Sequence, residues 1–192
     1  MAFLRRPVAI RLAHGRTRAW RRGFAVLATL LFPGSDLGAS NHVSEVELKS
    51  AFLYRFTHYA EWPDASTPRG PIEICVLGRD QLAVELEEAV RGRSVRDRPV
   101  TGRRLGSEED ATACHVLFVG WTDPGRIDGV LARTAELPIL TVGDVQGFAH
   151  RGGMINFLSI GSRLGFEINR DAAERAGLHL SSQLLKLATL VE

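Results

Sequence analysis

The sequence predicts a single-domain α/β protein with a mixed, mostly parallel sheet, helices on both faces and a C-terminal β-hairpin followed by helices. Short apolar segments that suit buried strands alternate with segments whose apolar residues recur at helical spacing, an order typical of parallel sheets. Near the C-terminus, two apolar segments are separated by only a short glycine-containing turn, which indicates a hairpin. The 192 residues, 45% of them hydrophobic, suit one domain and one processed segment.

Residues 1–39 differ from the rest of the chain. Seven arginines come first, an apolar run over residues 23–33 follows, and small residues lead to Ala39. The run is too short to cross a bilayer, which takes about 20 residues. This order is typical of a secretory signal peptide. We therefore expect a cleaved signal peptide over 1–39, a folded domain over 40–192 in the periplasm, and no membrane span after cleavage.

Residues 1–39 also bear on the export route and on the net charge of the mature domain. Arg21 and Arg22 loosely resemble a twin-arginine signal, but Trp20 stands where Ser or Thr is usual. We expect the general secretory route, with twin-arginine export as the alternative and a basic tail on a cytosolic protein as the alternative to export. Without residues 1–39 the net charge is −4, which argues against a nucleic-acid partner.

The first expected helix opens the domain. Ser44 and Glu47 form a capping-box pattern, and apolar residues then recur at helical spacing as far as Glu61. Pro63 disfavours helical backbone in the residue before it, so the helix should end at or before Trp62.

The middle of the chain alternates strands and helices. The expected strands cover residues 71–78, 114–120 and 137–143, and the expected helices cover residues 80–90 and 124–135. Residues 91–104 hold six arginines around Val95 and Val100. We expect a short edge strand there within a solvated loop, and the alternative is a surface for an acidic partner or lipid headgroups.

The C-terminal part begins with the hairpin, whose expected strands cover residues 154–159 and 163–168. Asn169 should cap a short helix that Gly177 closes. Ser181 or Ser182 should cap a last helix, whose apolar face would carry Leu184, Leu185, Ala188 and Val191.

Cys75 and Cys114 are the two cysteines of the chain. In an oxidising compartment a lone pair is a disulfide candidate, and it would close a loop of about 40 residues. Two buried free thiols are the alternative, because both cysteines lie in or beside apolar strand-like runs.

Several short blocks, taken in order from about Leu48 to Leu190, resemble the YfiR family of periplasmic regulators. The blocks are residues 49–56, 61–63, 74–78, 92–95, 114–118, 140–144, 152–157, 166–169, 176–178 and 181–188. Each block is weak alone, and their ordered series carries the resemblance.

The resemblance implies a mixed α/β fold in the periplasm and a disulfide between Cys75 and Cys114. It also implies a non-catalytic regulator that binds and inhibits the periplasmic sensor region of an inner-membrane diguanylate cyclase or another sensor protein. A homodimer is a further implication. Some relatives carry a second cysteine pair near Gly152 and Gly153, which this chain lacks. A periplasmic small-ligand binding protein is the alternative function.

Candidate contact residues lie on the first helix and just after it. Aromatic and arginine side chains dominate binding hot spots, and the candidates are Tyr54, Arg55, His58, Tyr59 and Trp62. Core packing is the alternative, and we expect it for Phe52 and Phe56. For Trp62 the alternative is a structural plug.

The sequence lacks the common motifs of catalytic and metal-binding sites. The chain has no Gly-x-Ser-x-Gly elbow and no phosphate-binding glycine motif, and its six histidines form no His-x-x-x-His pair. We therefore expect no enzyme activity, no metal site and no cofactor.

Overall fold

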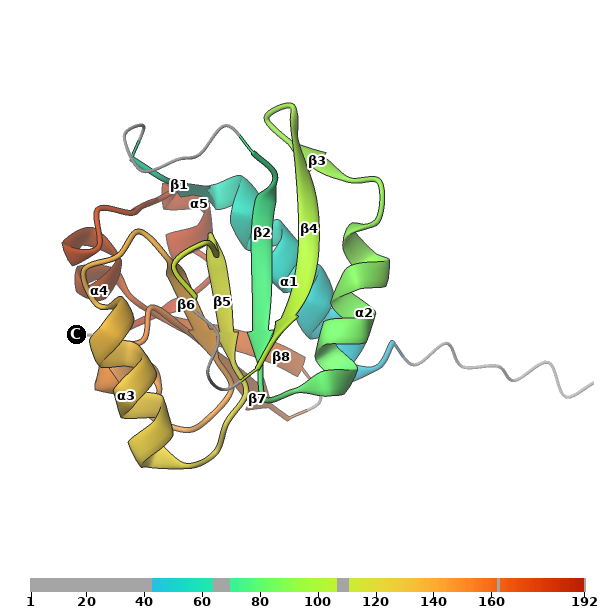
Figure 1. Cartoon of the computed structure of the whole chain (residues 1–192). Helices are drawn as coiled ribbons and strands as arrows, with labels where there is room; N and C mark the ends of the chain where they lie inside the picture. Colours follow the sequence, from blue (N-terminus) through green and yellow to red (C-terminus); the bar gives the residue numbers. More distant parts are fainter. Residues whose placement is uncertain (1–42, 64–69, 107–110, 162, 192) are drawn as a thin grey trace, which may run out of the picture. The chain divides into compact units, whose positions relative to one another are not determined.

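The computed structural model describes residues 43–63, 70–106, 111–161 and 163–191 (Figure 1). All the described residues belong to one compact unit. The expected signal peptide, residues 1–39, lies outside the described residues. Among the helices in the described ranges, none combines the length and apolar character needed to cross a membrane.

The helices of the described residues are α1 (Glu45–Tyr59), α2 (Asp80–Val90), α3 (Pro124–Thr134), α4 (Arg170–Arg175) and α5 (Ser182–Leu185), with a short 3-10 turn at Ala149–Arg151. The strands are β1 (Ala60–Glu61), β2 (Ile72–Leu77), β3 (Ser94–Val95), β4 (Arg98–Leu105), β5 (Val116–Val119), β6 (Leu140–Gly143), β7 (Ile155–Ile160), β8 (Arg163–Asn169), β9 (His179–Leu180) and β10 (Thr189–Val191).

The main sheet has eight strands in the order β10-β8-β7-β6-β5-β2-β4-β3. Strands β4, β2, β5, β6 and β7 run parallel, β8 is antiparallel to β7, and β10 is parallel to β8. Strands β1 and β9 form a separate antiparallel pair. The predicted fold class, with its mostly parallel sheet and C-terminal hairpin, is confirmed.

The central strands are buried on both faces, as is typical of parallel sheets between helices. In β2, Ile74 and Val76 point into a core shared with α1 and α2, which we call the α1-side core. Cys75 and Leu77 point into a second core shared with α3, the α3-side core. Figure 1 shows α1 passing behind β2 and β4.

The prediction of a last helix reaching Val191 was wrong. Helix α5 ends at Leu185, and Thr189–Val191 forms β10 alongside β8. The apolar spacing suited a helix, but the edge of β8 offers backbone donors and acceptors that β10 satisfies. Tertiary pairing here outweighs the local helical pattern.

The predicted short edge strand in residues 91–104 is present as β3, but the prediction of a solvated loop around it was wrong. Strand β4 is eight residues long and pairs with every residue of β2, and β3 is the edge strand. Val95, Val100 and Leu105 are buried. Four of the six arginines are exposed, and Arg104 lies 2.8 Å from Asp80. Arg98 and Arg103 are half-buried, and Arg98 donates to the Gly70 carbonyl at 2.9 Å.

Candidate functional site

A disulfide joins Cys75 on β2 to Cys114, just before β5, across 39 residues of sequence. The predicted pairing is therefore present. Both residues are buried in the α3-side core, so the bond strengthens the sheet on the face opposite α1.

Helix α1 carries most of the candidate contact residues. Its capping box is complete, because Glu47 N–H donates to the Ser44 hydroxyl and Ser44 N–H donates to the Glu47 carboxylate. Leu53 and Phe56 are buried in the α1-side core. These contacts fix the rotation of the helix and leave its opposite side, including Arg55, exposed.

Four of the five predicted contact residues line one groove of about 510 Å³, which we call the α1 groove. Ala51, Ala89 and Arg93 complete its lining, and the predicted members are Tyr54, Arg55, His58 and Tyr59. The groove thus combines aromatic rings with positive charge.

The rings of the α1 groove are held in place. The His58 ring meets the Tyr54 ring edge to face at 5.0 Å between centroids, and the Arg93 guanidinium lies 4.9 Å from the Tyr54 centroid. Partial burial, together with the charges of Arg55 and Arg96, lowers the pKa of His58 below its ordinary value. The groove therefore presents a neutral imidazole beside fixed arginine charges at neutral pH.

Trp62, the fifth predicted contact residue, lies outside the α1 groove lining. Its ring packs edge-on against His115 at 5.8 Å between centroids, and it is partly buried against the α1-side core. Its indole Nε1 is buried with no hydrogen-bond partner among the described residues. These contacts suit the structural-plug alternative better than partner contact.

His115 is itself a buried polar residue, only 6% exposed. Its Nδ1 accepts from the Glu73 backbone N–H at 3.2 Å, and its Nε2 lies 3.0 Å from Arg98 Nη2. Burial, and then the charge of Arg98, lowers the pKa of His115 to about 4. The ring is therefore uncharged at neutral pH.

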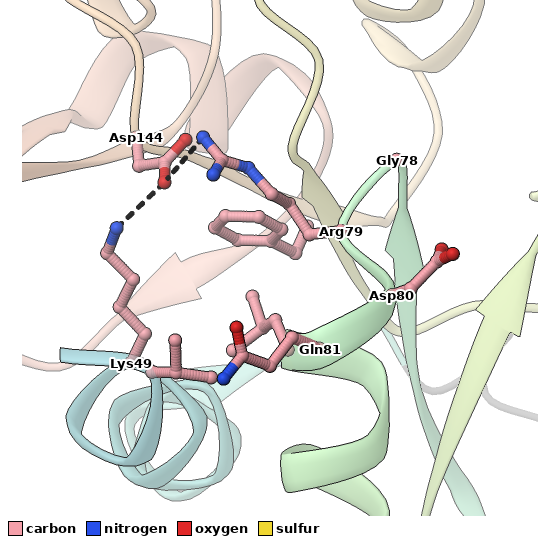
Figure 2. A pocket seen from close by; sticks show the side chains of 9 residues that line it. Lys49, Gly78, Arg79, Asp80, Gln81 and Asp144 are labelled. Carbon is pink, nitrogen blue, oxygen red and sulfur yellow. Dashed lines mark hydrogen bonds and ion pairs between the residues drawn. The ribbon is translucent and has the colours of Figure 1, made fainter. Parts of the chain in front are cut away.

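The sequence did not predict a second hollow, at the carboxyl ends of β2, β5 and β6. The chain leaves β2 for β4 on one side and leaves β5 for β6 on the other. Ligands of open α/β sheets bind where the strand order reverses in this way. A cleft of about 370 Å³ lies at this point, and we call it the switch-point cleft (Figure 2).

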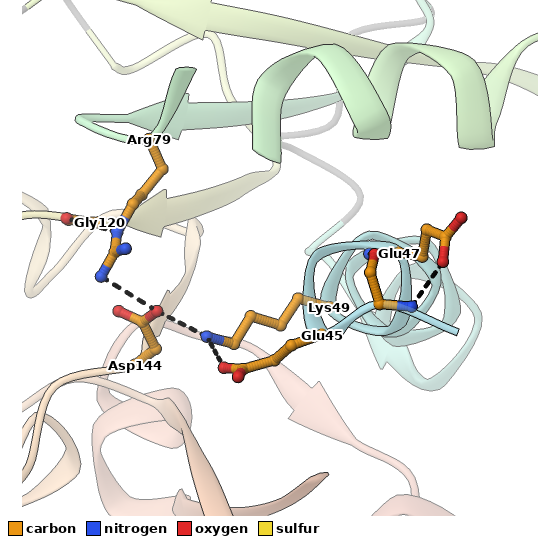
Figure 3. Close-up of polar contacts among 7 residues, drawn as sticks. Glu45, Glu47, Lys49, Arg79, Gly120 and Asp144 are labelled. Atoms are coloured by element: carbon orange, nitrogen blue, oxygen red, sulfur yellow. Dashed lines mark hydrogen bonds and ion pairs between the residues drawn. The ribbon is translucent and has the colours of Figure 1, made fainter. Parts of the chain in front are cut away.

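Charged side chains converge on the switch-point cleft. Lys49 Nζ lies 2.7 Å from Asp144 Oδ2 and 2.6 Å from Glu45 Oε1, and Arg79 Nη2 lies 3.5 Å from the same Asp144 oxygen (Figure 3). Arg79 Nε donates to the Gly120 carbonyl at 3.1 Å. The Lys49 and Asp144 side chains are 12% and 7% exposed, so this ion pair is largely shielded from water.

The contacts of Lys49 shift its own pKa and the pKa of Glu45. Burial acts to lower the pKa of Lys49, but hydrogen bonds and ion pairs with Asp144 and Glu45 outweigh it and raise that pKa. The hydrogen bond and charge of Lys49 lower the pKa of Glu45. Lys49 and Glu45 are therefore both charged near neutral pH.

The cleft residues are distant in sequence, since 95 residues separate Lys49 from Asp144. One signal was available: Arg79 and Asp144 each follow a glycine that ends or directly follows a predicted strand. Residues at the carboxyl ends of parallel strands meet at one edge of the sheet.

Within the described ranges, no group of three or more His, Cys, Asp or Glu is placed to hold a metal ion.

The fold, the α1 groove and the switch-point cleft define a small, disulfide-linked α/β domain with an exposed groove and a charged cleft. The chain belongs to the YfiR/HmsC-like family, whose sequence profile matches residues 46–189. The family is known for a periplasmic regulator and is regulatory rather than catalytic.

One solved structure with the same fold is a conserved domain protein from Vibrio cholerae. It shares 16% sequence identity with this chain and aligns with a TM-score of 0.50 over 78% of the chain. The chain spans 60% of that protein's length. At this identity the likeness extends to the fold alone. No curated protein matches the sequence.

Proposed function

We propose that the chain is a non-catalytic periplasmic regulator, which binds the periplasmic sensor region of an inner-membrane diguanylate cyclase and holds the enzyme inactive. Membership of the YfiR/HmsC-like family supports this function. The observation on this chain that carries it is the α1 groove, where Tyr54, Arg55 and His58 combine aromatic and cationic character.

Features of the chain support both the binding role and the periplasmic location. Rings and guanidinium groups that are already held together lose little conformational freedom when a partner binds. The disulfide between Cys75 and Cys114 supports an oxidising compartment. The expected signal peptide would bring the folded domain to the same side of the membrane as a cyclase sensor region.

The test compares host strains that lack the gene and carry it back in wild-type or variant form. Wild type should lower cellular c-di-GMP, and Arg55→Glu should restore little of this effect. Arg170→Glu is the matched control, because Arg170 is also an exposed arginine and pairs only with its neighbour Glu174 among the described residues. An unchanged c-di-GMP level on gene deletion would exclude cyclase inhibition.

Fractionation of the same strains tests the location. The chain should appear in the periplasmic fraction with both cysteines resistant to thiol labelling. Recovery of uncleaved chain with two free thiols in the cytoplasm would contradict the proposal.

A further inference from the structure

We propose that the α1 groove binds an acidic segment of a partner protein, whose carboxylates pair with Arg55 and Arg93 and whose apolar side chain covers Ala51 and Ala89. The inference rests on the proposed function only in taking the groove as a protein-binding site. It adds the chemistry of the bound segment, and it does not require that the partner is a cyclase.

The α1 groove contains two guanidinium groups that no carboxylate of the described residues neutralises. Arg55 and Arg93 form no ion pair within that part of the chain, whereas the neighbouring Arg91 lies 2.6 Å from Glu88. None of the described residues that line the groove is acidic. Uncompensated positive charge in a concave site attracts a negatively charged partner and disfavours partners of like charge.

Arg96 adds positive charge beside the groove. It lies in the two-residue turn between β3 and β4, and its guanidinium is 3.7 Å from Glu61, so its charge is only loosely paired. Burial lowers the pKa of His58, and the charges of Arg55 and Arg96 lower it further. The arginines therefore create a positive potential at the His58 ring, inside the groove.

The positive charge of the groove is local, which favours a protein segment over a membrane surface. The chain after residue 39 has 17 basic and 21 acidic side chains, a net charge of −4. Anionic lipid headgroups would repel that net charge, and they attract proteins through clusters of about four or more Lys and Arg. The two unpaired arginines of the groove are too few for such a cluster, but they suit the carboxylates of a short acidic segment.

Two alanines supply an apolar part of the groove. Ala51 belongs to α1 and Ala89 to α2, and these two helices pack against each other. Their small side chains leave open a volume of about 510 Å³. An apolar side chain of the partner would cover both methyl groups and leave water, which favours binding.

Tyr54 and Arg93 already hold each other in place. The Tyr54 hydroxyl donates to the Ser94 carbonyl at 3.4 Å, and the Arg93 guanidinium lies over the Tyr54 ring. An arginine held against a ring loses less conformational freedom when it pairs with a carboxylate. Guanidinium groups bind carboxylates through two parallel hydrogen bonds. The groove therefore favours acidic side chains in a defined orientation.

The first experiment uses a synthetic probe. The protein, purified from cells that express the full sequence, is titrated with acetyl-Glu-Leu-Glu-Leu-Glu-amide and followed by amide NMR. A second peptide with Gln in place of every Glu keeps the leucines and removes the charge. We expect the acidic peptide to bind about tenfold more tightly, as charge-assisted hydrogen bonds allow. The amide signals of Ala51, Arg55 and Arg93 should shift on binding.

The second experiment compares variants of exposed arginines. Arg55→Met and Arg93→Met should each weaken binding of the acidic peptide about fivefold and leave the affinity for the Gln peptide unchanged. Arg91→Met is the matched control, because Arg91 is equally exposed but already paired with Glu88. It should change either affinity by less than about twofold. All three arginines are exposed, so the variants should fold.

The third experiment identifies the natural segment. The photoreactive amino acid p-benzoylphenylalanine replaces Ala51 in the host, and mass spectrometry identifies the cross-linked partner peptide. That peptide should carry several Asp or Glu next to the cross-link. An acidic peptide from a protein other than a cyclase would contradict the proposed function and support this inference. A peptide without acidic residues from a cyclase would do the reverse.

Three further results would overturn the inference. They are equal affinities for the acidic and Gln peptides, chemical-shift changes that avoid the groove, or phosphatidylglycerol vesicles that shift the groove signals when the acidic peptide does not. The last result would assign the groove to a lipid surface instead of a protein segment.

Discussion

The α1 groove and the switch-point cleft share a helix but are built in different ways. Tyr54, Arg55 and His58 are near neighbours on α1 and partly or fully exposed. Lys49 also belongs to α1, but it reaches Asp144 from 95 residues away in a largely buried ion pair. One region depends on helical spacing, and the other depends on how the chain crosses between strands.

This difference has a consequence for energetics. Exposed side chains contribute little to folding, whereas removing one member of a buried ion pair leaves the other charge without compensation. Substitutions in the cleft should therefore lower the free energy of unfolding, and substitutions in the groove should not.

Loss of the disulfide should lower the free energy of unfolding the most, and it should leave the α1 groove and the switch-point cleft intact. Replacing Cys75 and Cys114 by serine opens a link across 39 residues, and we expect a loss of about 4 kcal/mol in unfolding free energy. Urea denaturation followed by circular dichroism measures the loss. Because both cysteines lie in the α3-side core, the folded double variant should still lower c-di-GMP in the complemented deletion strain. A loss of this effect in the folded protein would mean that the two faces of the sheet are coupled.

Acid should destabilise the protein through His115. Its pKa in the folded state is about 4, below the ordinary 6.5, so the unfolded chain takes up a proton first as the pH falls. The stability contributed by the neutral ring is complete above pH 6.5 and is lost between 6.5 and 4, by about 3 kcal/mol. Unfolding free energies measured across this range should show the slope, and His115→Gln should flatten it.

The matched control is His58 in the α1 groove, whose pKa is lowered in the same direction. His58 is exposed, so His58→Gln should change the slope less than His115→Gln does. An equal change from both substitutions would show that the groove histidine is as tightly held as the buried one, and the contrast between exposed and buried sites would fail.

The sequence predicted the fold better than it predicted the cleft. Apolar runs placed β2, β5 and β6, because strands buried on both faces read as continuous hydrophobic segments. Thr189–Val191 was assigned wrongly, because its strand form depends on the free edge of β8. The cleft was not predicted from the sequence. The order of the strands in the sheet brings Arg79 and Asp144 together, and no local sequence pattern specifies that order.

The candidate contact residues show the same limit on a smaller scale. Tyr54, Arg55 and His58, which were predicted together on the first helix, line one groove. Trp62 follows the helix, where periodicity no longer applies, and it packs against His115 instead. Trp62 is close to Tyr59 in the sequence. Because α1 ends at Tyr59, however, Trp62 does not lie on the helix face that lines the α1 groove.

Removing the Lys49 ammonium from the cleft should lower the free energy of unfolding moderately. Lys49→Met leaves the buried Asp144 carboxylate with Arg79 at 3.5 Å as its ion-pair partner among the described residues, and we expect a loss of about 2 kcal/mol. Arg170→Met, which breaks an exposed pair, should lose under about 0.5 kcal/mol. Equal losses in the two variants would show that the cleft ion pair is solvated in solution.

The pH dependence of the same pair has a definite sign. The pKa of Lys49 is raised, so its stabilising contribution is complete below its ordinary pKa and is lost only as the pH rises beyond it. The Lys49→Met variant should therefore lack the alkaline part of the stability loss that wild type shows above pH 10.5. An identical alkaline profile in both proteins would contradict this assignment.

Substitutions in the α1 groove should have the smallest effect on stability and a large effect on regulation. Arg55→Ala and His58→Ala remove exposed side chains, so each should change the unfolding free energy by less than about 0.5 kcal/mol. The same variants should fail to lower c-di-GMP in the complemented deletion strain, because the groove loses charge and a ring that a partner would contact. Lys49→Met gives the reverse pattern, a measurable loss of stability with c-di-GMP still lowered. If the groove variants unfolded as easily as Lys49→Met, the outward side of α1 would be part of the folding core, and binding there would lose its physical basis.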